Sequence, residues 1–373
     1  MWQRWLLLLL LAMGPAYGIE APSKITTAPS TTAPTAPTDT AATTDPQQLQ
    51  PQLVRVSHRQ RFANLKVDAS VVEALARADV ASAVAQLSAK AEANDPATNI
   101  ALIRVQHWCS HIPPRDRHRD PKLLEQLRPQ LSEPEATRLQ KLVDMELDYE
   151  AAASRSCQQA RFDYRLIEAQ LRETADAGEP MSVTELARLE TRPARVEELL
   201  QQAASKNYAP AQYALAMHRL IAVQRGEQTE NVASIRVLLK QAGRSSSQAK
   251  LDLANCMALG CEGHPGDISG AVVFGLDAAR DGQRDAYASI ARMPWAARLP
   301  MDQRLAWQYF GQRLNEAGCF GDHYLPMFRL LRENVVAYEK ASGSRLQEQA
   351  RKIAEQYWQD FGTRAQREQQ CLP

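Results

Sequence analysis

The feature of this chain that most constrains its fold is an alanine pattern that returns every 37 or 38 residues. Three alanines lie 38 and 37 residues apart, and each follows another alanine by seven positions. The pairs are Ala204 with Ala211, Ala242 with Ala249, and Ala279 with Ala286. Self-similarity at such a period is typical of arrays in which each repeat packs on its neighbours. We therefore expect a stack of similar units.

The units are predicted to be helical. From about residue 68 to the end, apolar residues recur at intervals of three and four, and no segment sustains the alternation of a half-buried strand. Residues 133–176 are expected to form one or two long helices, with Pro134 in a first turn, where proline is tolerated. The pattern predicts an all-α chain of short helices and short loops.

The stretch DISGAVVFGLDAARDGQRDA, which begins at Asp267, gives its small residues a physical role. The Asp267 side chain suits a helix N-cap, where it accepts hydrogen bonds from unpaired backbone amides. Ala271, Ala278 and Ala279 keep side chains short where neighbouring helices cross, so that backbones approach closely. Gly282 suits the left-handed position that ends a helix. The small residues thus mark the crossings and ends of packed helices.

With these residues the chain resembles the Sel1-like repeat proteins of the exported bacterial type, relatives of the tetratricopeptide repeat family. In that family the second helix of a repeat runs from an acidic residue to an alanine four positions later. An Ala-Ala pair, a glycine and the alanine that opens the next repeat follow, and Asp267, Ala271, Ala278, Ala279, Gly282 and Ala286 have this order. The resemblance implies an α-α solenoid of helix-turn-helix units. It also implies protein binding as a general role.

The resemblance covers roughly residues 200–325 and is imperfect there. Glu230, Ser234 and Ser245 stand where the family has aspartate, alanine and glycine. In the following copy the alanine after Ala306 comes eleven residues later instead of eight, which predicts a helix about one turn longer.

The N-terminal sequence predicts export. MWQRWLLLLLLAMGPAYGIE has one basic residue, a short apolar run and small residues at the positions that a signal peptidase recognises, which indicates a signal peptide over 1–18. An uncleaved membrane anchor is the alternative, but the run is shorter than the ~20 residues that span a bilayer. Residues 19–52 are rich in Thr, Ala and Pro and are predicted to be a disordered linker, with a glycosylated stalk as a further reading.

Charge and composition narrow the partners and the location. The whole chain has 44 basic and 43 acidic residues, so loss of Arg4 with the signal leaves a neutral protein. Nucleic acids and anionic membranes are usually bound by a basic excess, which argues against both as main partners. We expect no integral membrane segment after signal cleavage, and a periplasmic or secreted location.

Six cysteines, an even number, are expected to pair in an oxidising compartment, although fifteen connectivities are possible. A bond between Cys256 and Cys261 is favoured if Gly260 ends a helix between them and turns the chain back. Joining Cys319 to Cys371 would fix the terminal helix on the array. That leaves Cys109 with Cys157.

Two further motifs are candidate sites of chemistry. His107 and His111 lie one helical turn apart and could hold a metal, but no third ligand is specified, so an ordinary helix face beside a disulfide is favoured. SQAK, from Ser247 to Lys250, matches the spacing of a Ser/Lys acyl-enzyme motif, yet Ala249 belongs to the repeat. The charged loop PPRDRHRDP is expected to be solvated, with docking of a partner as the alternative for a polar loop at the edge of a stack. We predict no catalytic, metal-binding or cofactor-binding residues and no cofactor.

The aromatic residues near position 300 are the candidates for partner contact. Trp295, Trp307 and Tyr309 are more typical of a core, but any of them exposed on the inner face of the array would suit an interface.

Five segments are predicted. They are a signal peptide (1–18), a linker (19–52), a helical region of degenerate repeats or a cap (53–199), Sel1-like repeats (200–325) and C-terminal capping helices (326–373). We expect a non-catalytic scaffold or adaptor that binds a protein or peptide in the bacterial periplasm. The alternative is a cell-envelope enzyme or a wall-polymer-binding protein.

Overall fold

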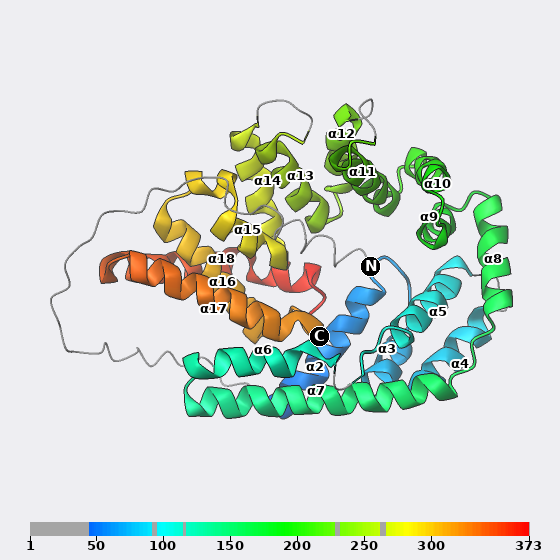
Figure 1. Ribbon diagram of the computed structural model, residues 1–373, viewed down its shortest axis with the longest axis horizontal. Coiled ribbons are helices and arrows are strands. Elements are labelled where there is room, and N and C mark those ends of the chain that lie inside the picture. The colour runs from blue at the N-terminus through cyan, green and yellow to red at the C-terminus, as the bar shows by residue number, and fades with distance from the viewer. Residues whose placement is uncertain (1–44, 92–94, 115–116, 228–231, 262–265, 373) are drawn as a thin grey trace. The chain divides into compact units, whose positions relative to one another are not determined.

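The computed structural model describes residues 45–91, 95–114, 117–227, 232–261 and 266–372 (Figure 1). Every regular element within these ranges is a helix, so the predicted all-α fold class is confirmed. The predicted signal peptide and residues 19–44 of the predicted linker lie outside the described residues. No helix in the described part of the chain is long and apolar enough to cross a membrane.

The first group of helices is arranged around the long helix α7, which packs on α2, α4, α5 and α6 (Figure 1). The elements are α2 (Pro46–Arg61), α3 (Ala69–Ala76), α4 (Val80–Ala91), α5 (Pro96–Cys109), α6 (Arg119–Leu127), the 3₁₀ helix η2 (Arg128–Gln130) and α7 (Glu133–Gln159).

The predicted linker ends too late, because α2 begins at Pro46. Asp45 caps this helix by accepting a hydrogen bond from the Gln47 amide, and proline is favourable in a first turn. Leu49 and Leu53, four residues apart, form a buried stripe. The Pro- and Gln-rich composition of residues 46–52 concealed this stripe.

The second group is a succession of helices that pack on one another in chain order, from α8 to α14 (Figure 1). They are α8 (Tyr164–Asp176), α9 (Pro180–Leu189), α10 (Pro193–Ser205), α11 (Ala209–Gln224), α12 (Val232–Ala242), α13 (Ser247–Leu259) and α14 (Ile268–Arg280). We call α9–α14 the helical array. This order of packing is that of a solenoid of helical hairpins.

The small residues of the repeat lie where the sequence predicts them. All eight repeat alanines are buried, namely Ala204, Ala211, Ala242, Ala249, Ala271, Ala278, Ala279 and Ala286. The Asp267 carboxylate accepts a hydrogen bond of 2.9 Å from the Gly270 amide and caps α14. Gly260 and Gly282 have φ of 71° and 77°, the left-handed conformation that ends a helix.

The remaining helices connect the array with the beginning of the described chain. They are α15 (Arg284–Arg292), η3 (Pro294–Arg298), α16 (Met301–Glu316), η4 (Gly321–His323), α17 (Tyr324–Ala341) and α18 (Ser344–Glu368). The Gln60 side chain in α2 donates hydrogen bonds to the carbonyl oxygens of Cys319 and Gln369, each at 3.1 Å. The two ends of the described chain are therefore in contact.

The six cysteines form the three pairs that the sequence favours. The Cα atoms are 5.7 Å apart in Cys109–Cys157, and 4.9 Å apart in both Cys256–Cys261 and Cys319–Cys371. Each distance lies within the range that a disulfide requires. The first bond joins α5 to α7, the second closes the turn after α13, and the third joins the segments that follow α16 and α18.

Candidate functional site

A cavity of about 80 Å³ lies among helices from distant parts of the sequence. Its lining comes from α2, from Trp108 in α5, from the middle of α7 and from the segment that spans η4 and the start of α17. Several ionisable side chains face it, namely His58, Arg61, Glu146, Tyr149, Glu150 and Asp322. A partly open cavity with this many polar groups distinguishes the region from the apolar crossings of the array.

One wall of the cavity is a hydrogen-bonded network around His58. His58 Nε2 lies 2.7 Å from the Tyr149 hydroxyl, which donates in turn to the Leu75 carbonyl oxygen at 2.9 Å. His58 Nδ1 accepts from Arg61 at 2.5 Å, and the guanidinium lies 4.8 Å from the centre of the Trp108 ring. Burial, and then the nearby Arg61 charge, hold the pKa of His58 well below its usual value. This imidazole is neutral, and both its nitrogens are occupied.

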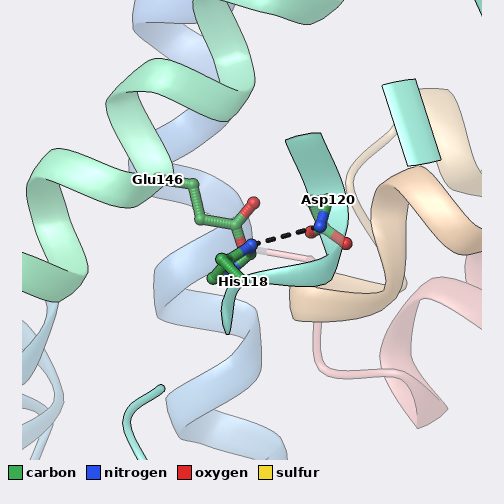
Figure 2. Close-up of side chains that lie close together, drawn as sticks. All are labelled: His118, Asp120 and Glu146. Carbon is green, nitrogen blue, oxygen red and sulfur yellow. Dashed lines mark hydrogen bonds between the residues drawn. The ribbon is translucent and has the colours of Figure 1, made fainter. Parts of the chain in front are cut away.

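A second polar group, shown in Figure 2, extends from the Glu146 and Glu150 lining of the cavity to the start of α6. His118 caps α6: its Nδ1 accepts a bond of 3.2 Å from the Asp120 backbone amide, drawn as the dashed line. The other ring nitrogen, Nε2, lies 3.1 Å from Glu150 Oε2 in α7. Glu146, one turn before Glu150, brings its carboxyl group beside His118 and Asp120. We call His118, Asp120, Glu146 and Glu150 the acid–histidine cluster.

The electrostatics of this cluster follow from burial and crowding. Burial raises the pKa of Glu146 well above its usual value, and the neighbouring Asp120, Glu150 and Asp322 raise it further. Burial also raises the pKa of Asp120. The hydrogen bond to Glu150 raises the pKa of His118 against the opposing effect of desolvation. The cluster therefore favours bound protons or another positive charge.

The Ser57 hydroxyl beside the cavity is already engaged. Ser57 Oγ donates to the Leu53 carbonyl oxygen at 3.0 Å and accepts from the Asp322 amide at 2.7 Å. Gly321, with φ of 52°, lies against Ser57, where a Cβ atom would come within 2.5 Å of Ser57 Oγ. These contacts fix η4 on α2. The acid–histidine cluster offers two kinds of chemistry: it can bind a cation, or it can share a proton among its members.

The structure tests the predictions for the charged loop and for the histidine pair. The prediction that PPRDRHRDP is solvated is wrong for His118 and Asp120, which are buried because they begin α6 against α7. The rings of His107 and His111 lie 4.0 Å apart at the exposed end of α5. Among the described residues, the one group of three or more metal-ligating side chains is His118, Asp120 and Glu146, which does not include this pair.

The aromatic candidates for partner contact are in the interior. Trp295 and Trp307 are buried, which confirms the favoured core interpretation and contradicts the alternative of partner contact. Trp295 donates to Asn255 in α13, and Trp307 stacks on Tyr357. Tyr309 is partly buried, and its hydroxyl donates to Glu339 at 2.6 Å. Their apolar area contributes to the core of the protein.

Neither the cavity nor the acid–histidine cluster is predicted by the sequence. Glu146 and Glu150, four residues apart, show that two acids share one face of α7. Nothing in the sequence indicates that this face is covered by α6 and the η4 segment. The one available signal was His118, placed like an N-cap two residues before Asp120.

The fold defines the class of this protein as an all-α protein that contains an array of helical hairpins. No protein-family model and no curated protein matches the chain. It is similar to the crystal structure of a protective antigen present in uropathogenic Escherichia coli strains, which displays an SLR (Sel1-like repeat) fold. The TM-score is 0.45 and the sequence identity 17%. The match covers 86% of this chain and 63% of the antigen chain, which is less than two thirds of that chain.

Proposed function

We propose that this protein is a non-catalytic scaffold or adaptor of the bacterial periplasm that binds a protein or peptide on its helical array. The observation that carries the proposal is the array itself. Helices that pack in chain order present a long preformed surface, which costs little conformational entropy to organise when a partner binds.

The surface of the array offers apolar anchors. Val237 in α12 and Val273 in α14 are 55% and 62% exposed, and Leu259 at the end of α13 is also exposed. These three helices pack in succession. Exposed aliphatic side chains on consecutive elements suit contact with an apolar partner surface.

The disulfides support the proposed location. All six cysteines are paired, and structural disulfides persist in oxidising compartments such as the periplasm. In the cytoplasm the same thiols would be kept reduced.

The test is an affinity capture from envelope extract with the full chain produced by export. Wild type is compared with a variant that carries Val237→Asp and Val273→Asp, which places charge at two exposed positions of the array and leaves the core unchanged. The matched control is Val336→Asp, since Val336 in α17 is 55% exposed and lies outside the array. We expect one stoichiometric partner that the control retains and the double variant loses.

Three outcomes would contradict the proposal. An empty capture would argue against a stable protein partner. Equal retention by the double variant and the control would place the binding surface outside the array. Hydrolysis of an envelope polymer by the purified chain would favour the enzyme alternative.

A further inference from the structure

Three side chains of metal-ligating type converge where α6 begins against the middle of α7 (Figure 2). One ligand atom from each of His118, Asp120 and Glu146 lies within 4.8 Å of the others. His118 and Asp120 are buried, and Glu146 is partly buried. One imidazole nitrogen and two carboxylate oxygens form a donor set that suits a divalent transition metal such as Zn²⁺.

The orientation of His118 is suited to binding a cation. Its Nε2 lies 3.1 Å from Glu150 Oε2, so the ring donates its proton there and Nδ1 keeps a lone pair. Nδ1 now accepts one long bond of 3.2 Å, from the Asp120 amide. A carboxylate that holds the far nitrogen of a histidine is the usual outer support of a metal ligand, because it fixes the tautomer and the ring.

An unsatisfied atom is the second observation that points to a ligand. Asp120 is only 3% exposed, and its Oδ1 has no hydrogen-bond partner. Arg119 Nε lies 3.6 Å from this oxygen. The Arg119 side chain is 60% exposed, so solvent screens most of its charge. Asp120 and Glu146 share a side-chain hydrogen bond. A bound cation would replace the proton of that bond and give Asp120 Oδ1 the partner that it lacks, which recovers the free energy that a buried unpaired oxygen costs.

Access and local charge are compatible with a bound cation. Glu146 and Glu150 line the 80 Å³ cavity, which reaches the cluster from the side of α2. Asp322 adds a further negative charge on the cavity wall, while Arg61 adds an opposing positive one. Arg119 would have to share Asp120 with the cation or move into solvent.

We propose that His118, Asp120 and Glu146 bind one divalent cation of the Zn²⁺ class, with Glu150 as the outer support of His118. Ligands sit about 2.0–2.2 Å from zinc, so side-chain movements on the order of 1 Å would close the present cluster around the ion. A water molecule completes a tetrahedral set. The cation joins α6 to α7 and is independent of the proposed partner surface on the array.

The experiment measures zinc retained by the metal-free full chain after equilibrium dialysis against ZnCl₂. We expect one zinc per chain in wild type. Glu146→Gln and Asp120→Asn each replace a ligand with a group of the same shape, and we expect loss of stoichiometric zinc from both. Glu150→Gln keeps the ligands but weakens their support, for which about a 10–100-fold loss of affinity is expected.

Controls separate this site from other sources of binding. Asp252→Asn changes a buried acid in α13, away from the cluster, and should retain the metal. Loss of zinc on replacing His107 and His111 by alanine, with retention in Glu146→Gln, would overturn the proposal in favour of the exposed histidine pair. Failure of wild type to retain zinc would also overturn it.

A measurement on wild type alone guards against variants that misfold. X-ray absorption of the zinc-loaded protein should show nitrogen and oxygen neighbours with one imidazole. Sulfur neighbours at roughly 2.3 Å would identify cysteine ligands and contradict the proposal. Circular dichroism of each variant checks that the helices are retained.

Discussion

The helical array and the cavity region of this protein are held together in opposite ways. In the array, alanines let the helices approach, and their contacts are between elements that follow one another along the chain. Around the cavity, polar groups join segments that are distant in sequence: 91 residues separate His58 from Tyr149, and 265 separate Ser57 from Asp322. Contacts between neighbours leave a period in a sequence, whereas contacts between distant segments do not.

The largest expected difference between the regions concerns their disulfides. Cys109–Cys157 joins α5 to α7 across 48 residues, whereas Cys256–Cys261 in the array spans five. Because a longer closed loop restricts the unfolded chain more, replacing the first pair by serine should lower the free energy of unfolding by about 4 kcal/mol. Replacing the second should cost about 2 kcal/mol. Urea unfolding of the two double variants measures both values.

Helical content provides the control for that comparison. Both double variants should keep the far-ultraviolet circular dichroism of wild type under native conditions, since each disulfide joins helices that are also packed. Equal losses of stability in the two variants would show that the two regions respond alike to loss of a crosslink.

The second prediction tests whether the array, like the cavity region, contains a buried acid whose pKa is raised by burial. Asp252 is a buried acid in α13 that accepts hydrogen bonds from Tyr213 at 2.8 Å and Gln248 at 3.0 Å. Burial nevertheless raises its pKa to about 6, from an ordinary value of 3.8. The folded state therefore binds this proton more tightly than the unfolded state does.

The sign of the pH effect follows from this difference. The contribution of Asp252 to stability is fully present below pH 3.8 and is lost as the pH rises through about 6. Asp252→Asn removes the titration, so its stability relative to wild type should rise by on the order of 2–3 kcal/mol between pH 4 and pH 7. Urea unfolding at a series of pH values measures the difference. A constant difference across this range would show that folding does not raise the pKa of Asp252.

Much of the array could be predicted from the sequence because its determinants are local. The period of alanines predicts the crossings, Gly260 and Gly282 predict helix ends, and Asp267 predicts a cap. Each of these residues packs, ends or caps a helix through contacts within one turn or with one neighbouring helix. The cysteine pairs could also be predicted, because Gly260 and the position of the terminal helix limited the possible disulfide connectivities.

The cavity could not be predicted, since its residues have no local signature. His118 and Asp120 sit in a segment so rich in charge that solvation was the natural expectation. They are buried because α7 supplies partners for them from the other side. Trp295 and Trp307 show the same limit, because whether a large aromatic residue lies in a core or on a surface depends on helices that the period does not include.

The smallest expected effect is one in which the two regions behave alike. Asp95 caps the N-terminal end of α5, the helix whose last turn supplies Trp108 to the cavity, by accepting from the Thr98 amide at 3.1 Å. Asp267 caps α14 in the array through the Gly270 amide at 2.9 Å. Asp95→Ala and Asp267→Ala should each cost about 1 kcal/mol, whereas asparagine at either position should retain most of the stability. Thermal unfolding of the four variants measures these changes. A loss of stability several times larger at one cap than at the other would mean that helix ends in that region depend on more than the local cap. The difference between local contacts in the array and long-range contacts around the cavity would then apply to the helix ends as well.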